Sequence, residues 1–356
     1  MTKNELLKEI ENDNTIEGCT LMGVDLSGMD LTGVRFESVM FIEVDFSSSK
    51  IVKTGFKNCY FEKSSFDHVN FESLFWQNMH LYRCSFKAAN LPKCLFSGME
   101  FTECDFTDAN LTQTSFNKSR INAVYFYRTN CKKTTFTMSE MKDTRFLEAR
   151  LLSTTFFQTE MAGTKFSNTN LKKCVLMECN LKGQHFSNMR LEKVQFNKSD
   201  LCQSDFNGAD ISMSNFIGCN LAGCDFSHTV ATHTIFTQAI LKSVDFTGAK
   251  LYQSNFQEAA IMGSNFRDAV MEQSYFASAA IQNTDFQRAD AKYVNFNYVV
   301  FENVRFTDAD LSHASMHSAI LKESGLEGAN TFALKKTDPD LLEAEHFSYH
   351  DHSVGE

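Results

Sequence analysis

The chain has 356 residues, is 43% hydrophobic and carries a formal net charge of −10 at pH 7. It contains no apolar run long enough to span a membrane, and no apolar signal-peptide segment follows Met1. These features favour a soluble, cytoplasmic protein, with secretion as an effector as the alternative.

Residues 1–15 predict a short helix that caps the segment after it. Thr2 and Glu5 have the spacing of a capping box, and Leu6, Leu7 and Ile10 lie on one side of a helix from Thr2 to about Ile10. Such a cap would cover apolar side chains and unpaired backbone at the end of a repetitive structure.

An unbroken period of five residues occupies the chain from Ile16 to Leu326. Every fifth residue, which we call the centre, is apolar or small at all 63 positions, and 31 of the 35 phenylalanines are centres. The residue two places before the centre, which we call the slot, is Ala, Ser, Thr, Cys or Val in 56 of the 63 repeats. This period fits neither a helix nor a long strand, so the backbone must turn once per repeat, with the centre and the slot facing inward.

An Asp or Asn often stands between slot and centre, as in Ala109-Asn110-Leu111, Ala209-Asp210-Ile211 and Ala309-Asp310-Leu311. This pattern resembles the pentapeptide-repeat family, whose motif is A(D/N)LXX. The resemblance implies an all-β solenoid, a right-handed quadrilateral β-helix with four repeats per coil. Residues 16–330 would then form about 15–16 coils, a rod of roughly 75 Å at strand spacing.

Four repeats per coil would stack residues that are 20 apart. Of the 28 centres taken every tenth residue from Phe36 to Phe306, 26 are Phe, and only Trp76 and Leu176 differ. The centres between them are mainly Leu, Ile and Met. We therefore predict aromatic ladders on two opposite walls and largely aliphatic ladders on the other two.

The eleven cysteines follow the same pattern. Nine occupy slots, Cys131 is a centre, and Cys202 lies just outside a centre. This placement predicts small buried side chains rather than redox or metal sites, and Cys84 and Cys104 are the one pair that we expect to stack. We expect neither a cofactor nor a metal.

Three positions in the unbroken repeat hold unusual residue types. Leu74-Phe75-Trp76 puts a large residue in a slot and predicts a local bulge, Gln184 puts an amide in a slot, and Pro92 would remove one ladder donor at a corner. Local repacking explains each of these, and a recognition surface is the alternative. Glycines two places after a centre, such as Gly23 and Gly223, predict tight corners with positive φ.

Residues 331–356 predict a C-terminal cap and a disordered tail. Asp338 and Pro339 would begin a short helix, and Phe332, Leu334 and Leu341 would serve either a cap or a homodimer contact. His346, His350 and His352 in the tail are able to bind metal, but a terminal location without a second cluster favours disorder.

Two sets of outward residues are candidates for partner binding. Residues 51–200 carry a net charge of +7, and one column of this region contains Lys53, Lys93, Lys133, Lys173 and Lys193. These lysines would either contact an acidic protein or a nucleic-acid backbone, or keep a long β edge soluble and unaggregated. Aromatic residues that would serve as binding anchors are Tyr60, Phe75, Tyr82, Tyr125, Tyr127 and Phe157.

The sequence contains no motif of a catalytic site, and a filled rod without inserted loops offers no pocket for one, so we expect no enzyme. The leading interpretation is a non-enzymatic interaction scaffold that docks a protein partner through its outer faces. The family resemblance adds a DNA-mimicking protein that binds gyrase and protects it from quinolones or toxins. The solenoid alone has a net charge of −4, whereas duplex DNA of the same length carries about 44 negative charges. The charge therefore argues against DNA mimicry along the whole rod. Direct nucleic-acid binding is not expected.

Overall fold

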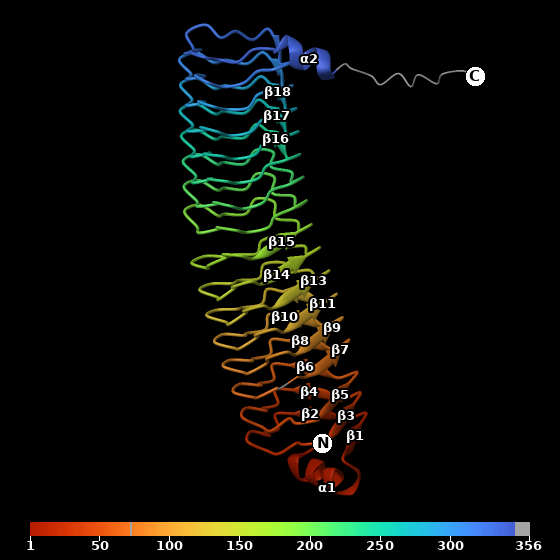
Figure 1. Ribbon diagram of the computed structural model, residues 1–356. Helices are drawn as coiled ribbons and strands as arrows, with labels where there is room; N and C mark the ends of the chain where they lie inside the picture. The colour runs from red at the N-terminus through yellow and green to blue at the C-terminus, as the bar shows by residue number, and fades with distance from the viewer. Residues whose placement is uncertain (72, 346–356) are drawn as a thin grey trace, which may run out of the picture.

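Backbone hydrogen bonds join residues that are 20 apart, so four repeats make one coil, as the sequence predicts. The computed structural model describes residues 1–71 and 73–345. It is a parallel β-helix of about 15 coils with one short helix near each end (Figure 1). We number its walls by their first centres: wall 1 contains Ile16 and every twentieth residue after it, wall 2 Leu21, wall 3 Leu26 and wall 4 Leu31.

The assigned strands are three residues long and lie on walls 1 and 2. Wall 1 contains β1 (Thr15–Glu17), β3 (Arg35–Glu37), β5 (Gly55–Lys57), β7 (Phe75–Gln77), β9 (Leu95–Ser97), β11 (Ser115–Asn117), β13 (Thr135–Thr137), β14 (Thr155–Phe157) and β15 (Val175–Met177). Wall 2 contains β2 (Thr20–Met22), β4 (Met40–Ile42), β6 (Tyr60–Glu62), β8 (His80–Tyr82), β10 (Glu100–Thr102), β12 (Arg120–Asn122), β16 (Ile240–Lys242), β17 (Ala260–Met262), β18 (Ala280–Gln282), β19 (Val300–Glu302) and β20 (Ile320–Lys322). Walls 3 and 4 are joined coil to coil by single bridges such as Asp25↔Asp45 and Asn90↔Asn110.

Each repeat turns at the same place, the residue two positions after the centre, which we call the corner. Every corner from Gly18 to Ala333 has a positive φ, whether the residue is Gly23 (60°) or Lys133 (58°). Glycine reaches this conformation without strain, whereas other residues lose about 1–2 kcal/mol there. The predicted role of the glycines is therefore confirmed, but most corners use residues that the ladder of backbone bonds must hold in place.

The Asp or Asn before the centre supports the turn. Its side-chain oxygen accepts the N–H of the residue after the centre, as from Thr107 to Asp105 at 2.9 Å and from Ser227 to Asp225 at 2.8 Å. That N–H points to a side chain and not to the next coil. Pro92 occupies this position, so the expectation that it removes a ladder donor was wrong.

Stacked phenylalanines fill the interior. Phe206 and Phe226 lie in neighbouring coils with ring centroids 4.5 Å apart and an interplanar angle of 7°, whereas Phe216 on the opposite wall meets Phe226 edge to face at 5.8 Å. Phenylalanine columns thus occupy walls 1 and 3, as predicted. All eleven cysteines are free, including Cys84 and Cys104, and nine are buried.

The two ends differ. Helix α1 (Lys3–Asp13) has the predicted capping box of Thr2 and Glu5, continues beyond Ile10, and buries Leu6 completely against the first coil. Helix α2 (Pro339–Glu345) begins after Asp338, whose carboxylate accepts the N–H groups of Asp340 and Leu341.

Helix α2 buries none of its residues and lies beside the last coils (Figure 1). Ladder bonding continues to Lys335, beyond the expected end of the solenoid at residue 330. Phe332 is 70% exposed and Leu341 is exposed, so within the described residues they do not form the cap that the sequence led us to expect. The histidine-rich tail lies outside the described residues.

Candidate interaction surface

The five candidate lysines lie together along one edge of the rod. Lys53, Lys93, Lys133, Lys173 and Lys193 are all exposed corner residues of wall 4, with φ between 55° and 63°. At about 4.8 Å per coil, the first four charges recur roughly every 10 Å. We call this column the lysine stripe.

Within the described residues, no carboxylate pairs with any lysine of the stripe. Stacked ion pairs are common elsewhere on the rod, for example Lys63 with Glu43 at 3.0 Å and Arg128 with Asp108 at 2.6 Å. Even beside the stripe, Lys172 pairs with Glu192 at 3.5 Å. The stripe therefore presents its positive charge to solvent without an intramolecular partner.

Neutral amides lie beside the stripe on wall 4, at the positions just before the centres. Asn70, Asn90, Asn110 and Asn130 form a ladder in which each side-chain amide donates to the oxygen of the one before it, at 2.8, 2.7 and 3.2 Å. Arg150 and Arg190 continue the same column. Wall 4 is therefore electropositive along the first two thirds of the rod.

The aromatic candidates do not form one patch. Phe75 and Phe157 lie on wall 1, Tyr60 and Tyr82 on wall 2, and Tyr125 and Tyr127 on wall 3. They are spread over about five coils and three walls, because one coil takes 20 residues and the chain turns every five.

On wall 3, the two tyrosines line a shallow groove of about 300 Å³ together with Arg145 and Leu147. The Arg145 guanidinium lies 5.3 Å from the Tyr125 ring centroid, and that of Arg128 lies 4.2 Å from the Tyr127 ring centroid, so both rings take part in cation–π contacts. This groove is a smaller feature than those on wall 4.

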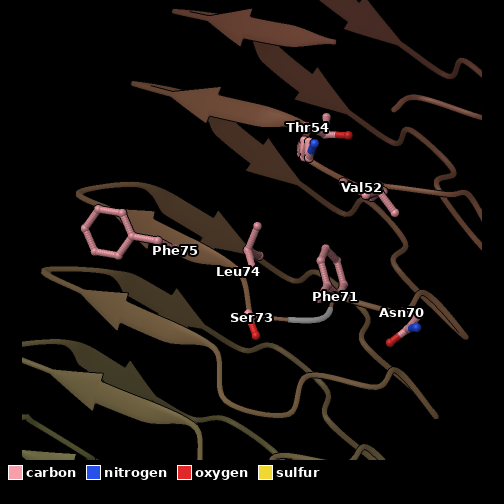
Figure 2. Close-up of a pocket in the computed structure, with 9 residues that line it drawn as sticks. Val52, Thr54, Asn70, Phe71, Ser73, Leu74 and Phe75 are labelled. Carbon is pink, nitrogen blue, oxygen red and sulfur yellow. The ribbon is translucent and has the colours of Figure 1, made fainter. Parts of the chain in front are cut away.

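The predicted bulge is a gap in wall 1 between β5 and β7, which we call the first opening. These neighbouring strands of wall 1 belong to separate sheets, and Leu74 is only half-buried in its slot. The resulting open groove of about 500 Å³ is lined by Ile51, Val52, Lys53, Thr54, Asn70, Phe71, Ser73, Leu74 and Phe75. Figure 2 shows Phe75 pointing away from Phe71 and Leu74, and its side chain is among the most exposed of the aromatic residues, at 57%. The first opening thus joins an apolar surface to Lys53 of the stripe.

A second opening lies on walls 3 and 4, between the coils that begin at Met161 and Leu181. Two adjoining grooves of about 510 and 390 Å³ run along it, and Figure 1 shows the axis of the rod changing direction near this level, beyond β15. The sequence marked this region only through Gln184 and Met189, two of the seven slots that depart from the small-residue pattern.

The described residues contain no cluster of three or more His, Cys, Asp or Glu side chains able to hold a metal ion. No helix in the described part of the chain is long and apolar enough to cross a membrane. Burial raises the pKa of the slot thiols, to about 12 for Cys174 and Cys224, which keeps them in the unreactive thiol form.

Two family models match the chain, both built on this repeat. The model described as a pentapeptide repeat region matches residues 189–266 and 209–285, and the model described as pentapeptide repeats (8 copies) matches residues 19–58, 80–117 and 284–322. Together they cover more than half of the chain. The chain belongs to the pentapeptide-repeat family.

Among solved structures, this pentapeptide-repeat protein is similar to HetL from the cyanobacterium Nostoc sp. strain PCC 7120, a protein involved in heterocyst differentiation regulation. The identity is 19%, over 75% of this chain and 90% of HetL, with a TM-score of 0.25.

It is also similar to a pentapeptide repeat protein of the Arabidopsis thaliana thylakoid lumen, at 28% identity over 28% of this chain and 66% of that one, with a TM-score of 0.21. A third similar structure is full-length QnrB1, a plasmid-mediated fluoroquinolone resistance protein, at 13% identity over 80% of this chain and 100% of that one, with a TM-score of 0.24. None of the curated proteins matches the chain.

Proposed function

We propose that this pentapeptide-repeat protein is a non-enzymatic scaffold that binds an acidic surface of a partner protein through wall 4. The observation that carries the proposal is the lysine stripe, whose charges have no carboxylate partner among the described residues. Four of these lysines donate a backbone bond to the next coil, as from Lys93 to Thr112 and from Lys193 to Ser212, both at 3.0 Å. A partner therefore meets a largely preorganised row of charges, and less ordering entropy is lost on binding.

The first opening supplies an apolar anchor at one end of the stripe. Val52 and Phe75 are exposed there beside Lys53. An interface needs such an apolar centre in addition to charges, because rim charges mainly increase the association rate and the specificity. We therefore place the contact at the N-terminal half of wall 4.

The alternative role of the stripe is protection against aggregation. Such charges protect unpaired strand edges from pairing with other chains. In a β-helix most coils pair with the coils on both sides, so unpaired backbone is confined to the ends and the openings. The stripe instead runs along a lateral edge, which favours a binding role. Its positive charge also opposes DNA mimicry on this wall, since a mimic presents negative charge.

The test is affinity capture from native extract with the triple variant Lys93→Glu, Lys133→Glu, Lys173→Glu. A matched control reverses the same number of exposed lysines on other walls, Lys118→Glu, Lys142→Glu and Lys242→Glu. We expect the partner to be recovered by the wild type and the control, and its affinity for the stripe variant to fall by about 10-fold or more. Equal recovery by the stripe variant would contradict the proposal.

A further inference from the structure

The second opening interrupts the backbone ladder on walls 3 and 4 and at Gly163, the corner that leads from wall 2 to wall 3. In the coil before it, Phe146 N–H donates to the Lys165 carbonyl at 2.8 Å, and in the coil after it, Phe186 N–H donates to the Asp205 carbonyl at 2.7 Å. Between these coils, six backbone hydrogen bonds that adjoining coils make are missing from the described backbone. The missing donor and acceptor pairs are Gly163 and Lys182, Phe166 and His185, Asn168 and Ser187, Leu171 and Arg190, His185 and Thr164, and Arg190 and Thr169.

Walls 1 and 2 remain closed at the same level. Leu176 N–H donates to the Gln195 carbonyl at 2.7 Å, and Met161 N–H donates to the Asn180 carbonyl at 3.2 Å. The separation reaches the core, because the stacked rings of Phe166 and Phe186 are 6.2 Å apart, whereas Phe186 and Phe206 in the next coils are 5.0 Å apart. The opening is therefore a wedge with its wide side on walls 3 and 4.

Two long side chains in successive slots account for the wedge. Gln184 lies in a slot of wall 3, where its amide donates to the Met161 carbonyl at 3.2 Å, and Met189 is half-buried in the next slot, on wall 4. The same slots contain Ser204 and Ala209 one coil later. A long slot residue is not sufficient alone, because Met79 and Met99 are fully buried beside the paired strands β6, β8 and β10.

Basic side chains line the wedge. Its two grooves are bordered by Lys165, Lys182, His185 and Arg190, and no Asp or Glu is among the described residues that line them. Lys182 pairs with Asp200 at 3.1 Å outside the grooves. The structure gives no ion-pair partner among the described residues to Lys165, His185 or Arg190.

We propose that the second opening binds an extended acidic segment of a partner protein. Unpaired N–H and C=O groups in a row complement the backbone of an extended peptide, and the cations complement carboxylates on its side chains. A nucleic-acid strand fits less well, because its phosphates would meet the open carbonyl groups as well as the donors. This inference deepens the proposed scaffold function by adding a discrete site that can be tested apart from the lysine stripe.

Closing the wedge without changing its charge is the decisive test. The double variant Gln184→Thr, Met189→Ala restores ordinary slot residues, and threonine keeps a donor for the Met161 carbonyl, as Thr164 does for Met141 one coil earlier at 2.6 Å. We expect the ladder to re-form, so that the amides of Phe166 and Asn168 exchange quickly with solvent in the wild type and slowly in the variant.

Binding is measured by fluorescence anisotropy with the full chain and a labelled hexapeptide of alternating Glu and Val. We expect the closed variant and a Lys165→Glu, Arg190→Glu variant each to bind at least about 10-fold more weakly than the wild type. A Lys93→Glu, Lys133→Glu variant of the stripe serves as the control and should bind within about 2-fold of the wild type.

Several results would overturn the proposal. One is a closed variant whose amides have become protected but which binds the peptide as tightly as the wild type. Another is a stripe control that loses as much affinity as the wedge variants. The third is a wild type that does not bind the peptide. A labelled single-stranded oligonucleotide that binds the wedge more tightly than the peptide would assign the site to nucleic acid instead.

Discussion

The slot residue has two roles in each coil: it fits beside the aromatic ladder, and its polar atom satisfies the backbone. Thr234 Oγ1 donates to the Ile211 carbonyl at 2.9 Å, and Cys174 Sγ donates to the Leu151 carbonyl at 2.8 Å, in both cases 23 residues earlier. Ser, Thr and Cys therefore serve as small donors, which explains why they share these positions with Ala and Val.

This placement predicts the reactivity of the thiols. A thiol with a pKa of about 12, such as Cys174 or Cys224, is almost entirely protonated at pH 8, and the thiolate is the reactive form. Cys19 and Cys202 are the two cysteines that are not fully buried. We expect a thiol reagent at pH 8 to modify at most these two rapidly in the native protein, and all eleven after denaturation. Rapid modification of more than two native thiols, counted by mass spectrometry, would contradict this assignment.

Single residues also mark the limit of prediction from sequence. The centres and slots follow from the period of five, since each is a strict choice of apolar or small side chain. The positive φ of Lys133 or Tyr293 cannot be predicted from the residue type, because neither residue favours that conformation. Both adopt it only where the backbone ladder imposes it. The lysine stripe was predictable as a column, but its lack of ion pairs depends on neighbouring side chains that the period does not specify.

At the scale of elements, α1 closes the N-terminal end. Leu6 is fully buried, and behind it Arg35 N–H donates to Asn14 at 2.8 Å and Gly18 N–H donates to Glu37 at 3.1 Å. Capping elements in solenoids stabilise mainly the coil that they touch, because each coil contacts only its neighbours.

The variant Leu6→Ala tests this role. Removal of a buried leucine side chain costs about 2–5 kcal/mol, and we expect this loss to appear as faster amide exchange at Gly18 and Arg35, with distant coils unaffected. Glu9→Ala, at an exposed position of the same helix, is the control. Unchanged exchange at Gly18, or a loss of protection throughout the rod, would show that α1 is not a local cap.

The openings show why element pairing was only partly predictable. Leu74 and Gln184 stood out in the sequence, and the bulge at Leu74 is confirmed by the separation of β5 from β7. Met79 and Met99 are equally long slot residues, yet their coils pair normally. Whether a coil opens therefore depends on which neighbouring slots hold long side chains and on which walls these slots lie. The packing of several coils decides this, and the period of five alone does not predict it.

For the molecule as a whole, the second opening divides one solenoid into two weakly coupled parts. The stability of a repeat protein is close to a sum of repeat terms and nearest-neighbour interface terms. Loss of the six backbone hydrogen bonds, at about 1 kcal/mol each, makes this interface about 6 kcal/mol weaker than its neighbours. The two parts should therefore unfold at different denaturant concentrations.

Trp76 makes this testable, because it is the only tryptophan and lies well before the opening. In urea titrations, its fluorescence reports the N-terminal part alone, whereas far-UV circular dichroism reports the whole rod. We expect the two transitions to have different midpoints in the wild type and to converge in the Gln184→Thr, Met189→Ala variant, because restored ladder bonds would couple the parts. Thr164→Ser, a conservative change in a slot of the adjoining coil, should leave the two midpoints apart. Coincident transitions in the wild type would mean that the closed walls 1 and 2 transmit enough stability to keep the solenoid a single cooperative unit.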